Sequence, residues 1–148
     1  MILDETIFPD VIKKLNNGYN VIIDVTDDSM FPFIIGGNDR VMISPLSKSE
    51  IPLGAIILAQ TVNGTYVLNR KVKNADENGY ITLISDGGIN DINQCHEKNI
   101  IGIARKIIRP NATWIELDKL SERRKGIIWY NLLPIRRYLI NILRKFYI

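Results

Sequence analysis

The sequence predicts a mostly β domain with short flanking helices, and three features of its 148 residues support this fold class. Short runs rich in Val, Ile and Leu fill the middle of the chain. Asn-Gly dipeptides separate two pairs of these runs, which is a strong signal for β-hairpins. Apolar residues recur at helical spacing only near the two ends. We therefore expect an N-terminal helix within residues 1–19, an antiparallel β body over 20–110 and an extension with an amphipathic helix over 111–148.

The N-terminal part of the chain predicts one helix followed by two strands. Residues 4–16 place their apolar side chains on one helical face, and the Asn-Gly pair that follows provides a stop. Pro9 falls early enough to be tolerated in a first helical turn. The pattern then changes to alternation over 21–25, and a β-rich run follows at 41–43. Both runs are expected to be strands of the β body.

Two Asn-Gly dipeptides, at 63–64 and 78–79, each lie between runs of strand character. The tight turn of a hairpin favours this dipeptide because its central residues need positive φ. A further β-rich run precedes the tail, and a segment rich in Gly, Asn and Asp is expected to be one long loop. The predicted strands are 56–59 with 65–68, 67–74 with 80–84, and 100–108, and the predicted loop is 85–99.

The tail is predicted to contain a short strand or a turn of helix near Trp114, and then an amphipathic basic helix within 127–148 that Pro134 can begin. Two interpretations of this helix remain open. Its Ile, Leu and Phe face could pack on the β body or on a second subunit. Alternatively, the helix could lie on an anionic membrane surface, because Trp and Tyr suit the lipid interface and the cations attract anionic lipids.

The positive charge of the chain is concentrated in this tail. The net charge is +3, yet seven Lys and Arg residues and no acids follow Glu122, so residues 1–122 carry twelve cations against sixteen acids, a net charge of −4. Nucleic acid is therefore not an expected partner of the β body. One cysteine, an acidic N-terminus and the lack of any long apolar run predict a cytoplasmic protein, or one peripheral at the inner membrane surface. No residue spacing suggests a metal site, and no cofactor is expected.

The candidate site begins with the stretch VTDDSMFPFIIGGNDRV at 25–41, in which Ser29 stands between two aspartates and an apolar run. A turn followed by core residues would explain this stretch taken alone. Further motifs follow in order, namely Pro-Leu-Gly-Ala-Ile-Ile-Leu-Ala, Tyr-Val-Leu-Asn-Arg-Lys-Val and Ser-Asp-Gly-Gly. Together with Ser-Met-x-Pro and Gly-Gly-Asn-Asp-Arg-Val, their order and spacing over 20–108 resemble the signal-peptidase and LexA-type serine peptidase superfamily, and are most similar to its short soluble bacterial members.

The resemblance implies a nucleophile and a base. In such peptidases the serine before methionine attacks, and a lysine or histidine directly before an arginine takes its proton. Ser29 has the nucleophile's position, but the base position holds Asn69, whose carboxamide has no titratable nitrogen near neutral pH. Asp27 replaces a glycine that the family usually has there. Asp86, or alternatively Asp91, matches the aspartate that supports the base in histidine-type members.

Two other groups are candidates for the missing base. Lys71 would lie on the same face of a regular strand as Asn69, and it could reach Ser29 if desolvation removed its proton. Cys95 and His96 resemble a protease pair, but adjacent residues rarely present both side chains to one atom. We therefore expect a small semi-buried cysteine and a surface histidine.

The resemblance also implies a partner. Met30, Phe31, Pro32 and Phe33 would form the apolar floor of a cleft that binds a peptide or protein segment in extended form, as an added strand. We expect a serine-peptidase-family protein with reduced or lost proteolytic activity. The alternatives are a non-catalytic peptide-binding or interaction protein that uses the retained cleft, and an active peptidase with Lys71 as base.

Overall fold

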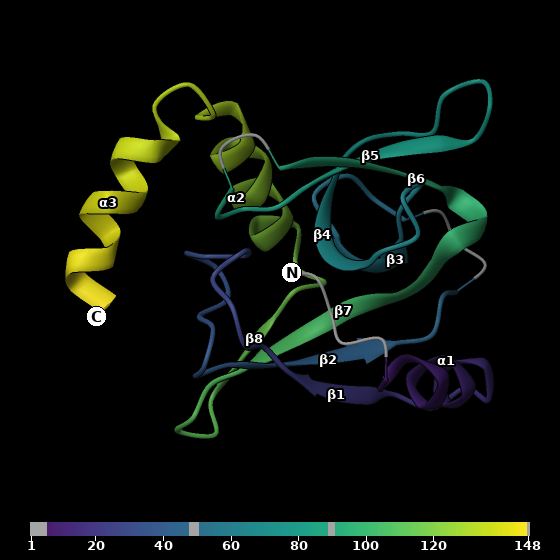
Figure 1. The fold of residues 1–148 in the computed structure, drawn as a ribbon. Coiled ribbons are helices and arrows are strands. Elements are labelled where there is room, and N and C mark those ends of the chain that lie inside the picture. The colour runs from purple at the N-terminus through teal and green to yellow at the C-terminus, as the bar shows by residue number, and fades with distance from the viewer. Residues whose placement is uncertain (1–5, 48–50, 89–90, 148) are drawn as a thin grey trace.

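The protein is built on one eight-stranded antiparallel sheet with a helix near its N-terminus and two helices at its C-terminal end (Figure 1). The computed structural model describes residues 6–47, 51–88 and 91–147. The predicted mostly β fold with flanking helices is confirmed. The helices are α1 (Phe8–Asn16), α2 (Leu120–Asn131) and α3 (Arg136–Tyr147), and the strands are β1 (Val21–Asp24), β2 (Arg40–Ser44), β3 (Ile56–Gln60), β4 (Tyr66–Lys73), β5 (Tyr80–Ile84), β6 (Ile92–His96), β7 (Ile100–Ile108) and β8 (Trp114–Glu116).

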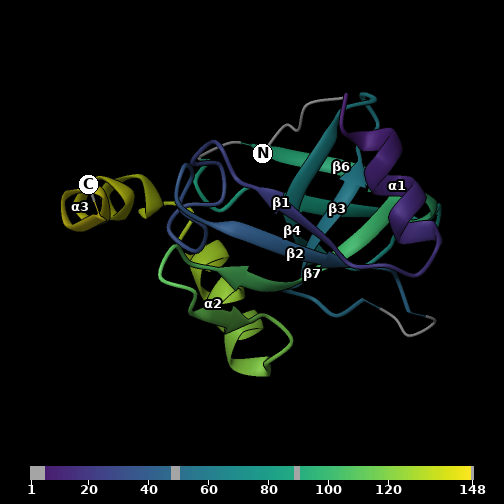
Figure 2. The ribbon, with the colours of Figure 1, turned by 90° about the horizontal axis from the view of Figure 1, so that it is seen from below.

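The long strand β7 joins the two parts of the sheet. The strand order is β1-β2-β7-β3-β4-β5-β6, and β8 also pairs with β7. The second half of β7 pairs with β2 and β8, whereas its first half pairs with β3. The edge strands of this path are therefore β1 and β6. Helices α1 and α3 lie at opposite ends of the molecule (Figure 1 and Figure 2).

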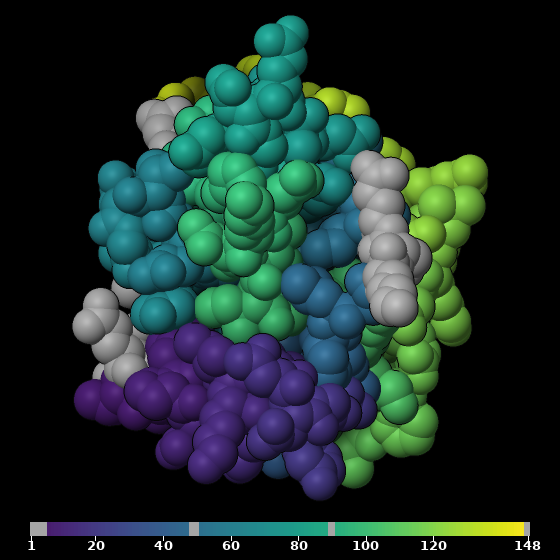
Figure 3. Space-filling view, turned by 90° about the vertical axis from the view of Figure 1, so that its right-hand side faces the viewer, coloured from purple at the N-terminus to yellow at the C-terminus, as the bar shows by residue number. Residues whose placement is uncertain are grey.

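The N-terminal helix and the first two strands lie where the sequence predicts them. Helix α1 begins at Phe8 instead of residue 4, with Pro9 in its first turn, where a missing N–H does no harm. Residues 1–5, which include the first two residues of the predicted helix, lie outside the described residues. Phe8, Val11 and Leu15 form the buried face of α1 and pack in the main apolar core with side chains of β1 and β2. In Figure 3 this purple segment covers the lower end of the molecule.

Both predicted hairpins are present. The dipeptide at 63–64 lies between β3 and β4, and the dipeptide at 78–79 lies between β4 and β5. Both glycines have a φ of +85°, which side-chain-bearing residues rarely adopt. In this register Asn69 lies opposite Ile57, and Arg70 projects from the other face of β4 because side chains alternate along a strand. The two neighbours therefore serve different parts of the molecule.

The sequence prediction is wrong for two segments. The predicted loop 85–99 contains strand β6 and a 3₁₀ turn at Glu97–Asn99. The β6 sequence Ile-Asn-Gln-Cys-His has no apolar alternation, and its conformation comes from full pairing with β5. Helix α2 begins in a charged stretch for which no helix was predicted, and it is anchored by two buried residues, Gly126 and Trp129. Near Trp114 the strand alternative is confirmed by β8.

Candidate functional site

Ser29 lies in the loop that connects β1 to β2, and several contacts fix the path of this loop. Asp39 at its end is buried, and its carboxylate forms an ion pair with Arg109. Gly36 lies against Asp27, where a Cβ atom would come within 2.2 Å of the Asp27 carbonyl oxygen. Only glycine fits at that position, so the Gly-Gly motif keeps the two halves of the loop in contact.

The carboxylate of Asp27 binds both hydrogen-bond donors of Ser29. The Ser29 backbone N–H donates to Asp27 Oδ1 at 3.1 Å, and the Ser29 hydroxyl donates to the same oxygen at 2.8 Å. The Ser29 carbonyl accepts a hydrogen bond from the Gly87 N–H at 2.7 Å. Gly87 cannot carry a side chain, because a Cβ atom would come within 2.2 Å of the Asp28 carbonyl oxygen. The serine is thus held between its own loop and the turn at 85–88.

Ser29 and Asn69 line the same cavity, which has a volume of about 190 Å³. The walls come from the Ser29 loop, from β4 with the residue before it, and from the start of β6. The structure therefore brings together the two positions that the sequence singles out for nucleophile and base. We call this space the Ser29 cavity, and its lining residues are Asp27, Ser29, Thr65, Val67, Asn69, Asp91 and Asn93.

The carboxamide of Asn69 is fully buried and makes no hydrogen bond. Its exposure is 0%, and neither Oδ1 nor Nδ2 has a partner among the described residues. Leaving a buried polar group unpaired costs about 1–3 kcal/mol, so such groups call for an explanation. Asn69 projects from the same face of β4 as Val67, in line with Thr65, which the sequence analysis did not select. Because side chains on one face of a strand recur at every second residue, the position of Asn69 would have identified Val67 and Thr65 from the sequence.

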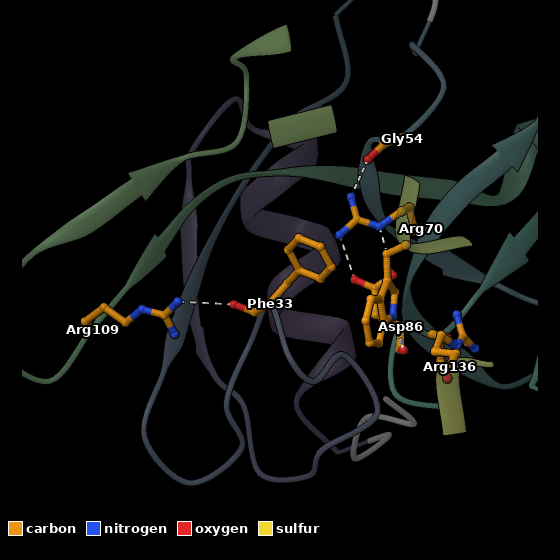
Figure 4. Close-up of polar contacts among 8 residues, drawn as sticks. Phe33, Gly54, Arg70, Asp86, Arg109 and Arg136 are labelled. Carbon is orange, nitrogen blue, oxygen red and sulfur yellow. Dashed lines mark hydrogen bonds and ion pairs between the residues drawn. The ribbon is translucent and has the colours of Figure 1, made fainter. Parts of the chain in front are cut away.

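Asp86 does not line the Ser29 cavity. Its carboxylate accepts two hydrogen bonds from Arg70, at 2.9 Å from Nε and 2.6 Å from the second terminal nitrogen, and both side chains are at most 2% exposed (Figure 4). Arg70 also donates to the Gly54 carbonyl at 2.7 Å and lies 4.8 Å from the ring centre of Phe33. The aspartate that lines the cavity beside Asn69 is Asp91, the alternative of the sequence analysis.

Two residues of the C-terminal helices hold the turn at 85–88. The indole N–H of Trp129 donates to the Asp86 carbonyl at 2.7 Å. The guanidinium of Arg136 is fully buried and donates to the carbonyls of Ser85, at 3.2 Å, and of Gly88. Burial lowers the pKa of Arg136, and the negative charge of Asp86 opposes this shift. The contacts of Trp129 and Arg136 with this turn could not be predicted from the sequence, because a basic amphipathic tail does not reveal which cation is buried.

Lys71 lies at a different cavity from Ser29. Its ammonium donates to the Ile51 carbonyl at 2.7 Å, and the residue is only 4% exposed. The cavity that it lines has a volume of about 250 Å³ and includes Ile51, Ile81 and Ile100 among its walls. The structure therefore does not bring this amine to the Ser29 cavity.

The apolar run after Ser29 does not line the Ser29 cavity. Met30 is 0% exposed and belongs to the main core with residues of α1, β1 and β2. Phe31 is 2% exposed and packs with Trp129 and Ile140 of the C-terminal helices, and Phe33 lies against this cluster. Pro32 and Phe33 line a separate space beside Arg109. Met30 and Phe31 therefore connect the Ser29 loop to the core and to α2 and α3. An apolar floor for an extended peptide stays a prediction.

Cys95 and His96 do not form a reactive pair. Cys95 is buried among the apolar side chains of β3 to β7, and burial raises the pKa of its thiol to about 11. His96 lies at the edge of the molecule, with Nε2 at 3.0 Å from the Asn78 carbonyl oxygen and Nδ1 accepting from the Lys98 N–H at 3.1 Å. Among the described residues, no group of three or more His, Cys, Asp and Glu side chains could hold a metal ion.

No family model, curated protein or solved structure matches this chain. Across the described ranges, no helix has the length and apolar character needed to cross a bilayer.

Proposed function

We propose that this protein is a peptide-binding relative of the signal-peptidase and LexA-type serine peptidases, with proteolytic activity reduced or lost. One observation carries the proposal: the cavity that contains Ser29 also contains the fully buried carboxamide of Asn69, at the place where such a peptidase needs its base. A protein of this kind would act in the cytoplasm, at or near the inner membrane surface.

The chemistry of the cavity supports a low activity. A serine hydroxyl needs a proton acceptor in order to attack an amide, and a carboxamide does not accept protons near neutral pH. Loss of the base in a serine protease reduces kcat by about a millionfold. Asp27 also engages the Ser29 N–H and hydroxyl, which are the donors that an acyl-transfer reaction would use. The amine of Lys71 lies at another cavity.

The position of β1 supports a peptide in extended form. β1 is an edge strand that pairs only with β2 within the described sheet, and the chain continues from it directly into the Ser29 loop. A peptide that adds a strand along this edge would run toward the cavity and gain main-chain hydrogen bonds. Side chains of that peptide would then determine which segment is bound.

A fluorophosphonate probe tests the loss of activity. We expect no labelling of the natural protein, and labelling at Ser29 after Asn69→His combined with Asp27→Gly, because this variant has a base and frees both donors of the serine. The matched control adds Ser29→Ala to the double variant and should abolish labelling. If the natural protein labels at Ser29 as fast as the double variant, the proposal of lost activity is wrong.

A pull-down from a random decapeptide library tests peptide binding. Immobilised protein should retain peptides, and Asn93→Trp should reduce retention because Asn93 is half-buried and its side chain lies at the wall of the cavity. Arg105→Trp on β7 provides a control of similar exposure, since Arg105 does not line this cavity. Equal retention by both variants would contradict binding at the Ser29 cavity.

A second observation supports contact with an anionic membrane. Helix α3 packs one apolar face on the protein through Leu139, Ile140 and Leu143. A second apolar face stays exposed, with one residue in nearly every turn: Ile135 is 50% exposed, Tyr138 59%, Ile142 52% and Phe146 79%. We propose that this second face, together with the cations beside it, binds anionic lipid.

The charges next to this face fit anionic lipid. Arg137, Arg144 and Lys145 are exposed on α3, and no acid follows Glu122 in the sequence. Each cation near an anionic surface contributes about 1 kcal/mol. The packed face already accounts for the interaction of α3 with α2 and the Ser29 loop, so the exposed apolar stripe is available for another contact.

Vesicle co-sedimentation tests the membrane contact. Phosphatidylglycerol vesicles should sediment the protein, phosphatidylcholine vesicles should not, and added salt should weaken the binding. Ile142→Ser with Phe146→Ser should abolish sedimentation, whereas Ile128→Ser on α2, which is 60% exposed, serves as the control. Unchanged sedimentation of the double variant would contradict the proposed contact.

A further inference from the structure

The described lining of the Ser29 cavity carries negative charge and no positive charge. Two of its lining residues are acids, Asp27 and Asp91, and none is Lys, Arg or His. Neither acid forms an ion pair within the described part of the chain. Asp39 and Asp86, which are buried away from this cavity, each bind an arginine, whereas Asp27 and Asp91 are exposed at its rim. The two cavity carboxylates therefore leave negative charge available to a ligand.

The remaining lining groups are also rich in hydrogen-bond acceptors. Ser29 and Thr65 contribute hydroxyl oxygens, and Asn93 contributes a carboxamide that reaches Asp91 only at 3.4 Å. Among the described residues that line the cavity, Val67 is the one apolar side chain. A ligand group with several N–H donors and a positive charge would match this set, because carboxylates, carbonyls and hydroxyls all accept hydrogen bonds.

Asn69 gives a second and independent indication of a ligand. Its side chain is 0% exposed, both polar atoms are unpaired, and strand alternation directs it to the face that Thr65 and Val67 form at the cavity. A native protein seldom leaves such a group unsatisfied, and a ligand is one of the established explanations. The Oδ1 atom needs a donor, which an ammonium or a guanidinium group supplies.

We propose that the Ser29 cavity binds the basic side chain, Lys or Arg, of the extended peptide. This inference rests on the proposed peptide-binding function and adds the class of peptide. The volume of about 190 Å³ is below the roughly 300–1,000 Å³ of pockets for whole small ligands, so it suits a single side chain. Asp27 from the Ser29 loop and Asp91 from the residue before β6 would bind the cation, and Asn69 would accept a hydrogen bond at the buried end.

The experiment uses four fluorescein-labelled peptides that differ at one central residue: Ala-Ala-Xaa-Ala-Ala with Xaa as Lys, Arg, norleucine or Glu. Fluorescence anisotropy at low salt measures the dissociation constants with the full-length protein. We expect the Lys and Arg peptides to bind at least tenfold more tightly than the norleucine peptide, and the Glu peptide to bind most weakly. Asp27→Asn and Asp91→Asn should each reduce the preference for the Lys peptide about fivefold or more. Neither substitution should weaken the binding of the norleucine peptide.

A matched control removes one negative charge elsewhere. Asp10→Asn, on the exposed side of α1, should leave the preference unchanged, and circular dichroism should show that all variants are folded. Equal binding of all four peptides, or a preference that survives both substitutions, would overturn this inference while peptide binding stands. No binding of any peptide would overturn both proposals. Loss of the preference in EDTA would show that a divalent cation occupies the cavity, which would also overturn the inference.

Discussion

Replacing Asn69 by leucine is the substitution whose effect the structure predicts most directly. The carboxamide lies at a position with 0% exposure, opposite Ile57, which is also fully buried. Neither polar atom of the side chain is paired among the described residues. Leucine has similar length and no polar atoms, so the substitution removes the unpaired groups and keeps most of the packing. We therefore expect the variant to be more stable than the natural protein.

The size of the effect follows from the desolvation of the carboxamide. An unsatisfied buried polar group costs about 1–3 kcal/mol, and leucine removes this cost. Extra side-chain volume in a packed core can reduce the gain in the free energy of unfolding, since overpacking costs about 1–3 kcal/mol when it forces strain. The adjoining cavity of about 190 Å³ gives room for the larger side chain, so little strain is expected. At roughly 2–4 °C per kcal/mol for a chain of this size, a gain of about 1–3 kcal/mol raises Tm by roughly 2–12 °C.

Urea unfolding followed by circular dichroism measures this change. The control is Asn93→Leu, the same substitution at another residue that lines the cavity, where the side chain is only half-buried. Its effect should stay within about 0.5 kcal/mol. The stabilised Asn69→Leu variant should also lose preference for the Lys peptide. If Asn69→Leu lowers the free energy of unfolding by about 1 kcal/mol or more, the carboxamide is satisfied in the folded protein, and the reasoning about the cavity is refuted.

Three further predictions concern the rest of the molecule. Asp86→Asn removes one partner of a buried ion pair and should cost about 3–5 kcal/mol in urea unfolding, whereas Asp118→Asn, at an exposed pair, should cost less than about 1 kcal/mol. Gly126→Ala should cost about 1–3 kcal/mol and should weaken the docking of α2, because the added Cβ would come within 2.1 Å of the Arg70 guanidinium; unchanged proteolysis and stability would contradict this. Burial raises the pKa of the Cys95 thiol to about 11 from its ordinary value of 9.0, so its contribution to stability is fully present below pH 9.0 and should be lost as the pH rises toward 11. Cys95→Ala should flatten the pH profile of urea unfolding in that range.

The elements that the sequence predicts correctly are those set by local chemistry. The Asn-Gly dipeptides at 63–64 and 78–79 specify tight turns, and both hairpins are present. Strand β6 could not be predicted in the same way, because its polar sequence becomes a strand only through pairing with β5. Helix α2 is a similar case, since its position depends on the burial of Gly126 and Trp129 against distant residues.

The candidate site shows the same division. The sequence singled out Ser29 and Asn69, and the structure brings both to one cavity. It favoured Asp86 over Asp91, because a sequence does not reveal that Arg70 turns to the other face of β4 and binds Asp86 there. Amphipathic spacing in the tail likewise predicted a helix, but it could not tell a face that packs on the protein from a face that stays exposed.

The C-terminal helices support the position of Ser29, although none of their described residues lines the Ser29 cavity. Arg136 and Trp129 bind carbonyl groups of the turn at 85–88, and the Gly87 N–H in that turn binds the Ser29 carbonyl. Deleting the tail to test membrane binding would therefore also release the turn that positions Ser29. Point substitutions on the exposed face of α3 avoid this problem, because the packed face and the buried arginine remain. A lipid contact through the exposed face is compatible with a bound peptide, since α3 can keep its contacts with the turn while its other face meets the membrane.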